Sequence, residues 1–424
     1  MDNFLNKIFF RSRNLDYISK NLKDITHQTP VNKIFEAINS HSESSEVRYV
    51  GGCIRKIIKK ELVDDIDLAT NLKPNEVCEA LKKKAINYYE TGIEHGTITA
   101  IIDDHKFEIT SLRKDVVTDG RHAKVDYSSS WKEDAARRDF SINSIYSDNE
   151  GNLFDPHNGK KDLENGHIKF IGDAENRIKE DYLRILRYIR FFVNYSNHKH
   201  NPEIIKIIKR NIGGVSKISS ERLLDEFKKL SKSDGFIKLF SDKESLELIE
   251  IIFPQLKYLS SFKKQNSYAT NNLSKVDFIF LLSLMIVDES DNTDYFIYKF
   301  NISKKDQKRL RLIDLFYKTN MNIKNFTEKN FNKIFYFNGK QAVIDIINFK
   351  LFKSNKVEKN LIKLMEVYKD KIKPTMPVGA NVLMSKYNIP EGKILGKKLK
   401  SIEELWVQNG FQISDKQIQK IIKA

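Results

Sequence analysis

The pattern of the chain changes near Asp173, and this change limits the folds that are open to it. From about Val47 to Phe170, short apolar runs with period-two alternation lie between helix signals. Beyond Asp173 the apolar residues recur almost everywhere at helical spacing, and strand signals are few. We therefore predict an α+β fold, in which a small α/β head with a mixed sheet is followed by an all-helical neck, body and tail.

This pattern divides the 424 residues into four expected segments. An N-terminal helical segment (1–46) precedes the head (47–172), a helical neck (173–232) and a helical body and tail (233–424). The neck opens with the amphipathic stretch AENRIKEDYLRILRYIRFF, which predicts one long helix. Ser219-Ser220 predicts the cap of the helix that follows, ERLLDEFKKLSKS.

Within the head, alternation and turn residues predict the individual elements. The expected strands are VRYV, DIDLAT, GTITAII, KFEITSL and HIKFIG, and the expected helices are CIRKIIKK and NEVCEALKKKA. A tight turn is expected at Asp103-Asp104-His105, between two of the strands. The polar stretch DVVTDGRHAKVDYSSS is expected to be a mobile loop.

Composition limits the partners and the compartment. The 73 lysines and arginines exceed the 57 acidic residues by 16, which favours a polyanionic partner such as nucleic acid; a lysine-rich bias of the whole proteome is the competing explanation. The two cysteines, Cys53 and Cys78, lack metal-ligand spacing and indicate a reducing compartment. No apolar run approaches about 20 residues, so no membrane span is expected.

The start of the chain predicts an amphipathic helix rather than a targeting segment. The stretch MDNFLNKIFFRSRNLDYISKN lacks the long apolar region and the cleavage site of a signal peptide. Its arginines are compatible with an organelle transit peptide, but Asp2 and Asp16 argue against one. The cytoplasm of a bacterium is therefore expected ahead of a mitochondrion.

Asp65 and Asp67 stand two apart in a predicted strand, so their carboxylates would lie on one face. Two such carboxylates repel each other unless one is protonated or cations lie between them. A pair of Mg²⁺ ions about 3.5–4 Å apart is the usual solution in phosphoryl transfer. A solvated turn is the ordinary explanation for Asp-x-Asp alone. Glu108, between apolar Phe107 and Ile109, would join the pair if its strand is a neighbour.

A Gly-Gly pair, Gly51-Gly52, separates a predicted strand from a predicted helix just before these acids. Glycine allows the backbone N–H groups to form a concave nest that can hold a triphosphate, although many ordinary turns also contain Gly-Gly. Arg55 lies one turn into the helix and could reach the same phosphates. Three acids beside such a turn indicate metal-dependent nucleotide chemistry.

A longer series of motifs resembles the tRNA nucleotidyltransferase/poly(A) polymerase family, in its bacterial and mitochondrial class. The resemblance covers about residues 48–227 and extends more loosely to the end. The matching stretches, in the family's order and approximate spacing, are GGCIR…DDIDLAT, HGTITAII…FEITSLR, TDGRHAKV, ARRDFSINSIY, DPHNGKKDL, EDYLRILRYIRF and SSERLLDEF. Each is weak alone, and together they are highly specific.

The resemblance implies a role for each matching residue of the catalytic centre. Asp65 and Asp67 would hold two Mg²⁺ ions, and Glu108 would be the third catalytic carboxylate. The residues expected to contact the phosphates and sugar of the incoming nucleotide are Gly51, Gly52, Arg55, Arg138, Asp139 and Asn143.

Further residues are implied to select the base. Asp181 and Arg184 would read it from one face of the long helix, and Arg187 and Arg190 would support the phosphates and that helix, although both could be ordinary solvated arginines. Arg121, in the loop, would reorganise the site between the addition of C and of A. The helix with Glu221, Arg222 and Glu226 would form the supporting neck.

One position departs from the family pattern. Lys56 follows the arginine of the Gly-Gly motif, where the family usually has aspartate. The change removes an ion-pair partner near Arg55 without removing a metal ligand, so we expect activity to survive while the packing of that helix is in question.

The expected activity is addition of CCA to the 3′ end of tRNA from CTP and ATP, with Mg²⁺ as cofactor, pyrophosphate as product, no membrane and no obligate protein partner. The alternatives are a bacterial poly(A) polymerase, an enzyme that adds only CC or only A, and a non-catalytic RNA-binding descendant. The last should have lost a carboxylate, and all three are present.

Overall fold

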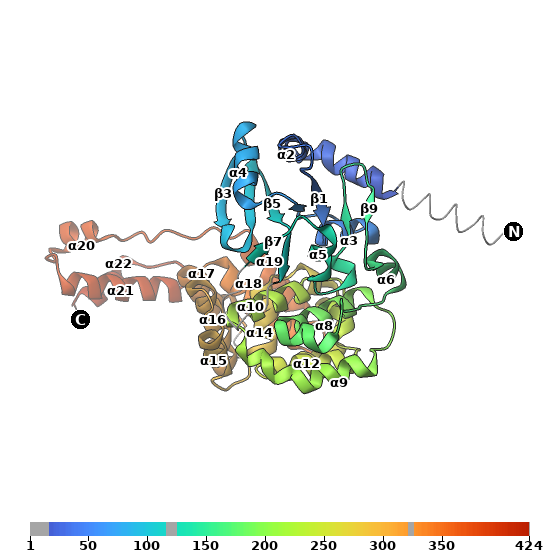
Figure 1. Ribbon diagram of the computed structural model, residues 1–424. Coiled ribbons are helices and arrows are strands. Elements are labelled where there is room, and N and C mark those ends of the chain that lie inside the picture. The colour runs from blue at the N-terminus through green and yellow to red at the C-terminus, as the bar shows by residue number, and fades with distance from the viewer. Residues whose placement is uncertain (1–16, 116–124, 321–325, 424) are drawn as a thin grey trace. The chain divides into compact units, whose positions relative to one another are not determined.

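The structure is a computed structural model that describes residues 17–115, 125–320 and 326–423 (Figure 1). The chain divides into two compact units, Met1–Ile218 and Ser219–Ala424. The boundary falls inside the range expected for the neck, so the neck is divided between the units. Most of the predicted N-terminal amphipathic helix lies outside the described residues, whose first helix covers residues 17–28.

The first unit is built on a mixed sheet, as predicted. Within the described residues, seven strands follow the order β3-β4-β5-β2-β1-β8-β9. Neighbouring strands are antiparallel except β2 and β5, which are parallel. The strands are β1 (Val47–Val50), β2 (Asp67–Thr70), β3 (Asn87–Gly92), β4 (Thr97–Ile102), β5 (His105–Ser111), β8 (Tyr146–Ser147) and β9 (Leu153–Phe154).

Alternating burial on β4 and β5 shows why these residues form strands. Ile98, Ala100, Phe107 and Ile109 are almost fully buried, whereas Glu108 is exposed. The apolar face packs in one core with residues of α2, α3 and α4. The helices of this unit are α2 (Asn32–Asn39), α3 (Gly52–Lys59), α4 (Pro74–Lys83), α5 (Trp131–Ala136), α6 (Gly159–Asn165), α7 (Ala174–Glu180), α8 (Leu183–Tyr195), α9 (Pro202–Asn211) and the 3-10 turns η1 (Ile93–His95), η2 (Ser141–Asn143) and η3 (Ile212–Lys217).

The prediction of a strand over HIKFIG is wrong. Only Phe170 forms a bridge, to Phe140, and the segment is not part of the sheet. Hydrogen bonds from Ser141 N to Lys169 O (3.0 Å) and from Ile171 N to Asp139 O (3.1 Å) bind the segment to the stretch that carries η2. The centroids of the Phe170 and Phe140 rings lie 4.6 Å apart. Phe170 therefore packs against the start of η2 instead of extending the sheet.

The prediction of one long helix from Ala174 is also wrong. The chain leaves the helix at Asp181, whose φ of −151° and ψ of 105° are extended, and α8 starts two residues later. The cause is local: the Asp181 carboxylate accepts a hydrogen bond from Leu183 N at 3.1 Å, and its carbonyl accepts from Arg184 N at 3.0 Å. A short polar side chain that bonds the backbone ahead of it starts a new helix instead of continuing the old one.

Part of the stretch predicted to be a mobile loop forms strands instead. Its two ends pair as the antiparallel strands β6 (Arg113–Asp115) and β7 (Val125–Tyr127). The stretch between them, residues 116–124, lies outside the described residues, and so does Arg121.

The second unit is helical throughout its described residues, as predicted. Ser219 caps its first helix by accepting a hydrogen bond from Arg222 N. Two separate apolar clusters lie in it, one in α16–α19 and one in α20–α22. Its elements are α10 (Ser220–Ser231), α11 (Phe236–Leu239), α12 (Lys243–Ile252), η4 (Leu259–Lys263), α13 (Ser267–Asn272), η5 (Leu273–Lys275), α14 (Phe278–Ile286), α15 (Asn292–Lys299), α16 (Lys304–Asn320), α17 (Glu328–Asn338), α18 (Lys340–Lys353), α19 (Lys359–Lys369), α20 (Ala380–Tyr387), α21 (Lys393–Gln408) and α22 (Asp415–Lys423).

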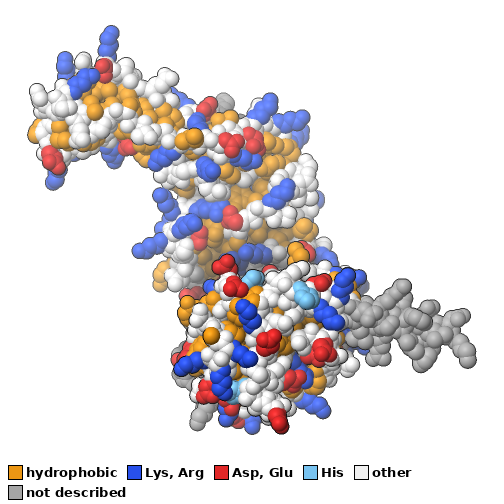
Figure 2. All heavy atoms as spheres, turned by 90° about the horizontal axis from the view of Figure 1, so that it is seen from above, with side chains coloured by type: hydrophobic (Ala, Val, Ile, Leu, Met, Phe, Trp, Pro, Cys, Tyr) orange, Lys and Arg blue, Asp and Glu red, His pale blue; other side chains and the backbone are white. Residues whose placement is uncertain are grey.

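On one face of the molecule, charged side chains of both signs are dispersed (Figure 2). On the face seen in Figure 2, lysine and arginine side chains lie among acidic and hydrophobic ones. In the part of the chain that the structure describes, no helix is both long enough and apolar enough to cross a bilayer.

Candidate active site

The three predicted carboxylates lie beside the parallel strands β2 and β5. Asp67 and Glu108 are register partners on these strands, so their side chains lie on the same face, and the predicted neighbour relation is confirmed. Asp65 precedes β2, which begins only at Asp67, so the strand argument for the Asp65 side chain does not hold. Asp65 and Glu108 are exposed, and Asp67 is half-buried.

Negative charge is concentrated around Asp67. Burial raises the pKa of its carboxyl, and the nearby charges of Glu108 and Asp65 raise that pKa further. Arg138 and Arg55 act in the opposite direction. Among the described residues, the three carboxylates do not form a set of oxygens that all lie within 4.8 Å of one another. The three acids nevertheless lie in one neighbourhood, because the charges of Glu108 and Asp65 both act on the Asp67 carboxyl.

The Gly51-Gly52 turn lies directly against these groups. Gly51 has a φ of +63°, which L side chains rarely adopt, and α3 begins at Gly52. A Cβ atom added to Gly52 would lie 3.6 Å from Asp67 Oδ2 and 3.9 Å from Arg55 Nη2. The missing side chain at Gly52 therefore leaves backbone exposed between a carboxylate and a guanidinium.

Arg55 is buried and held on two sides. Its Nε donates to the Tyr195 hydroxyl at 3.2 Å, its Nη1 donates to Asn143 Oδ1, and its guanidinium lies 4.8 Å from the centroid of the Phe191 ring. Among the described residues, its Nη2 donates to no protein group. The guanidinium is thus fixed in place, with one nitrogen available next to Gly52.

Asn143 and Asp139 connect this arginine to α8. Asn143 Nδ2 donates to Asp139 Oδ1 at 2.8 Å, and Arg187 Nε donates to Asp139 Oδ2 at 2.6 Å. Burial alone would raise the pKa of Asp139, but the charge of Arg187 and the bond from Asn143 outweigh it and hold that pKa below its usual range. Arg190 stacks on the face of Phe191, with its guanidinium carbon 4.2 Å from the ring centroid.

Arg138 has a protein acceptor for each of its three nitrogens. Nε and Nη2 each lie 3.1 Å from Asp134 Oδ2, Nε also donates to the Tyr146 hydroxyl at 2.9 Å, and Nη1 donates to Asn143 O at 3.3 Å. Asp134 is almost fully buried. Burial alone would raise the pKa of Asp134, but the charges of Arg138 and Arg137 hold it below its usual range.

Arg184 lies in the first turn of α8 and is oriented by α7. Its Nη1 donates to Glu180 Oε2 at 2.6 Å and to Arg177 O at 2.7 Å. Its Nε and Nη2 donate to no described protein group. Asp181 lies at the break before α8, so the two proposed base readers come from a helix start rather than from one helix face.

Lys56, the departure from the family pattern, forms an ion pair with Asp64. The pair joins α3 to the segment that carries Asp65. The helix is intact over its predicted length, so the substitution changes the partner of this position without disrupting α3.

Several supporting residues escaped the sequence analysis. Tyr195, Tyr146, Asp134 and Arg177 all bond to site residues or to their backbone; Arg177 Nη2, for example, donates to Arg138 O at 2.6 Å. Each lies far in sequence from at least one partner or inside an ordinary amphipathic helix, so periodicity carries no signal for it. Only the folded arrangement identifies these residues.

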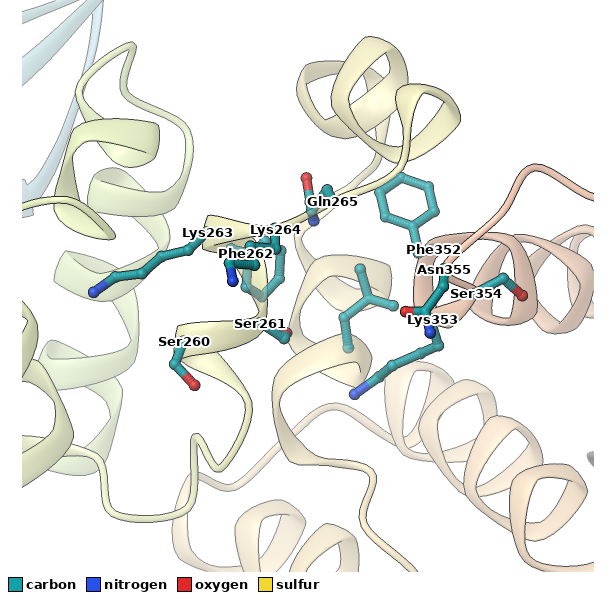
Figure 3. A pocket seen from close by; sticks show the side chains of 11 residues that line it. Ser260, Ser261, Phe262, Lys263, Lys264, Gln265, Phe352, Lys353, Ser354 and Asn355 are labelled. Carbon is teal, nitrogen blue, oxygen red and sulfur yellow. The ribbon is translucent and has the colours of Figure 1, made fainter.

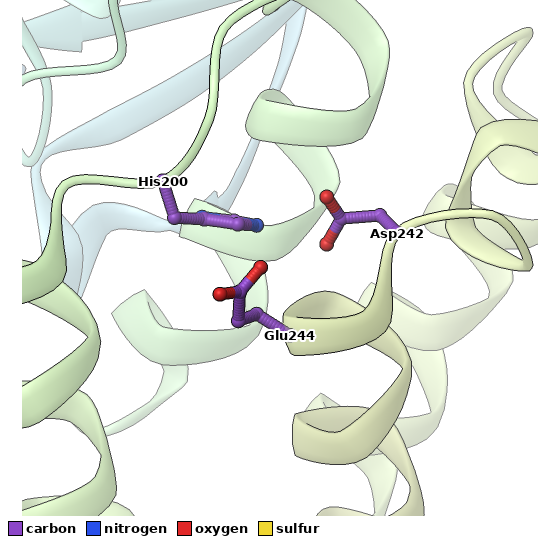
Figure 4. Close-up of side chains that lie close together, drawn as sticks. All are labelled: His200, Asp242 and Glu244. Atoms are coloured by element: carbon purple, nitrogen blue, oxygen red, sulfur yellow. The ribbon is translucent and has the colours of Figure 1, made fainter.

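Figure 4 shows three further titratable residues, which belong to different units. In the first unit, His200 bonds the Tyr188 hydroxyl through Nδ1 at 3.0 Å and stacks on Phe192. In the second unit, Asp242 caps α12 by accepting from Ser245 N at 2.7 Å, and Glu244 lies in the first turn of that helix. These roles within each unit account for His200 and Asp242 without a metal.

Comparison with family models identifies two regions. A model described as the poly A polymerase head domain matches residues 47–169. A second model, described as a probable RNA- and SrmB-binding site of polymerase A, matches residues 200–259.

Individual relatives match over most of the chain. The CCA tRNA nucleotidyltransferase 1, mitochondrial, of Homo sapiens is 32% identical over 392 residues, which is 90% of this chain and 87% of that protein. The CCA-adding enzyme of Staphylococcus haemolyticus is 31% identical over 317 residues, or 74% of each chain. The crystal structure of the Bacillus stearothermophilus CCA-adding enzyme in complex with CTP superposes with a TM-score of 0.72 at 20% identity, over 93% of this chain and 97% of that one, which shows the same fold.

Proposed function

The chain belongs to the tRNA nucleotidyltransferase/poly(A) polymerase family, and from this premise we propose that it adds C, C and A to the 3′ end of tRNA from CTP and ATP. The observation that supports the proposal most directly is the register of Asp67 with Glu108 beside the Gly51-Gly52 turn. Three carboxylates next to a Gly-Gly turn, together with an arginine that the protein holds in place, suit the binding of a nucleoside triphosphate with its metal ions.

The group of three carboxylates, Asp65, Asp67 and Glu108, fits Mg²⁺. The ion prefers carboxylate oxygens, and it would offset the negative charge of Glu108 and Asp65 that, after burial, raises the pKa of Asp67. We propose that Asp65 and Asp67 hold Mg²⁺ and that Glu108 completes the acidic set. When bound, Mg²⁺ lowers the pKa of the tRNA 3′-hydroxyl and neutralises charge on the departing pyrophosphate.

The arginines divide into two groups according to their partners. Arg55 keeps Nη2 available beside Gly52 and is the candidate phosphate ligand. Arg138 has acceptors for all its nitrogens, so we propose that it holds Asn143 and Asp134 in place rather than carrying most of the phosphate contact. Fixed side chains of this kind remove the need to reorganise the site in each cycle.

Base selection is proposed for Asp181 and Arg184. On their Watson–Crick edges, C and A both present an amino donor beside an unprotonated ring nitrogen, whereas U and G present a carbonyl beside a ring N–H. A carboxylate with a guanidinium complements the first pattern and opposes the second. Arg184 has Nε and Nη2 available for a base, and the loop residue Arg121 is proposed to adjust the site between C and A.

The test is direct. The protein is incubated with Mg²⁺ and tRNA that lacks its 3′ CCA, with CTP and ATP separately and together, and the products are sequenced. Addition of CC with CTP alone and of CCA with both nucleotides is expected. A long A tract would instead identify a poly(A) polymerase, arrest after CC or failure to add C would identify a partial enzyme, and no product with bound tRNA would identify a non-catalytic RNA-binding protein.

A further inference from the structure

A pocket of about 340 Å³ lies in the second unit, between η4 and the end of α18 (Figure 3). Three of its lining residues are lysines, five are serines or carboxamides, three are apolar, and none of these described residues is acidic. The lining residues are Ser260, Ser261, Phe262, Lys263, Lys264, Gln265, Leu284, Phe352, Lys353, Ser354 and Asn355. A lining of cations and neutral polar groups is suited to an anion with several oxygens.

Lys353 is a half-buried lysine of this lining. Its side chain extends from α18 toward the turn of Ser261, whereas Lys263 points away (Figure 3). Its Nζ lies 3.5 Å from the centroid of the Tyr258 ring. Among the described residues this ammonium forms no ion pair and no hydrogen bond, and Asp288 is the acidic group that influences it from a distance. Burial lowers the pKa of Lys353 to about 8.

A cation in this position destabilises the folded protein unless an anion binds to it. A half-buried ammonium without an acceptor loses hydration that no protein group replaces. The aromatic face of Tyr258 offsets part of that loss, since the face of the ring attracts a cation. An external anion that entered the pocket would supply the missing acceptor.

The end of α18 does not oppose an anion here. The last carbonyls of a helix are negatively polarised and ordinarily repel anions. In this case Asn266 Nδ2 donates to Leu351 O at 2.7 Å and to Ser354 O at 2.6 Å. The Ser354 hydroxyl lies 2.8 Å from both Lys350 O and Glu358 Oε1, so the nearby Glu358 carboxylate is also bonded within the protein. These carbonyls are therefore bonded within the protein rather than turned unpaired toward the pocket.

We propose that this pocket binds one phosphate of the RNA backbone, with Lys353 as the main cation. The inference rests on the proposed function, because that function supplies a tRNA whose phosphates are the anions at hand. It assigns to the second unit a defined contact that holds the substrate while the chemistry takes place elsewhere in the chain.

The test measures tRNA binding against salt concentration for the wild type, Lys353→Met, Lys353→Arg and Lys363→Met. Lys363 is an exposed lysine of α19 outside the pocket and serves as the matched control. Loss of one phosphate contact should lower the slope of log Kd against log salt by about 1 in Lys353→Met and weaken binding about tenfold at low salt. Lys353→Arg should restore most of the slope, and Lys363→Met should match the wild type.

The outcomes separate this proposal from the proposed function. If wild-type protein adds CCA and Lys353→Met keeps its full salt slope, the pocket assignment is overturned and the function stands. If the wild type neither binds nor extends tRNA, the function itself fails. Thermal unfolding with added inorganic phosphate distinguishes the sources of the anion: stabilisation of wild type but not of Lys353→Met, together with unchanged tRNA slopes, would identify a free-phosphate site and overturn the RNA assignment. The melting curves also show whether each variant is folded.

Discussion

At the scale of single residues, Asp67 is distinguished from the acid three positions before it by its neighbours rather than by its type. Asp64 is exposed and paired with Lys56, whereas Asp67 faces Glu108 and the Gly52 backbone. The two residues therefore provide a test and its control within one short segment.

Asp67→Asn should reduce the rate of nucleotide addition by more than about a hundredfold. Loss of a residue that only supports a metal ligand costs up to about a hundredfold, and loss of the ligand itself should cost more. Binding of tRNA should be largely retained. Single-turnover rates with Mg²⁺ as the only divalent metal would measure the loss, and Asp64→Asn should remain close to wild type. Full activity of Asp67→Asn would contradict its role as a ligand.

Tyr195 joins two charged residues through one hydroxyl. It accepts from Arg55 Nε and donates to Glu61 Oε2 at 3.3 Å. Tyr195→Phe keeps the ring but removes both bonds, which are worth about 1.5–3 kcal/mol where the partner is charged. We expect the KM for CTP and ATP to rise about tenfold or more while kcat changes little.

The matched control is Tyr188→Phe, which removes a hydroxyl on the same helix that bonds His200 instead of Arg55. If both variants raise KM equally, the effect is general loosening of α8. A selective rise in Tyr195→Phe supports the positioning of Arg55.

At the scale of elements, the break between α7 and α8 sets the position of the proposed base readers. Asp181 ends one helix and starts the next, and Arg184 follows in the first turn. Asp181→Asn retains a side-chain oxygen that can accept from Leu183 N but loses the negative charge. It should narrow the preference for CTP and ATP over UTP and GTP by about tenfold, while transfer persists.

Competition assays with all four nucleotides would measure this change. Asp173→Asn is the control, because the Asp173 carboxylate also accepts from a backbone N–H at a helix start, that of Asn176 at 2.9 Å, and lies away from the break. An unaltered preference in Asp181→Asn would place base reading elsewhere.

The contact between η2 and α8 should depend on pH in a definite direction. The pKa of Asp139 is held below its unfolded value, so its bonds to Arg187 and Asn143 stabilise the fold above about pH 4 and are lost as pH falls through the folded pKa. Asp139→Asn should cost about 2 kcal/mol of unfolding free energy at pH 7. That difference should shrink as the pH falls below about 4, which urea titrations at several pH values would show. A difference that stays constant with pH would show that the Asp139 charge does not contribute.

The elements were predictable from sequence where local patterns control them. Alternation on KFEITSL gave the exposed Glu108 between buried neighbours, and Ser219 gave a helix start. The prediction of a strand over HIKFIG was wrong because a pattern typical of a strand does not show whether another strand is available to pair with it. The break at Asp181 was missed because the helical periodicity of the sequence continues across a carboxylate that bonds the first backbone N–H of the next helix. Tyr195 was missed because its contact with Arg55 joins residues 140 positions apart.

At the scale of the whole molecule, the candidate chemistry and the candidate RNA contact belong to different units. The site residues from Gly51 to Arg190 lie in Met1–Ile218, and the Lys353 pocket lies in Ser219–Ala424. The chain carries an excess of 16 positive charges, and they are dispersed on the face in Figure 2. Such a distribution favours many phosphate contacts of modest strength over one dominant patch.

Binding of tRNA should therefore be much more sensitive to salt than use of single nucleotides. If about six phosphates are neutralised, affinity for tRNA should fall about a thousandfold between 50 and 200 mM salt. The KM for CTP at saturating tRNA should change far less, since a single nucleotide makes few such contacts. Fluorescence titrations of labelled tRNA would measure the first quantity and initial rates the second. Equal salt dependence would contradict a broad electrostatic surface for tRNA.

The helix break at Asp181 has a consequence for how the sequence of a tRNA end is specified. Most RNA sequences are copied from a nucleic acid, so an error in one gene alters one transcript. In the proposed mechanism the last nucleotides of tRNA are instead selected by a carboxylate and a guanidinium. The sequence of the tRNA end is therefore determined by the codons for Asp181 and Arg184. A single missense change there would relax the choice of nucleotide at the ends of all the tRNAs that this protein completes, because no template fixes that choice.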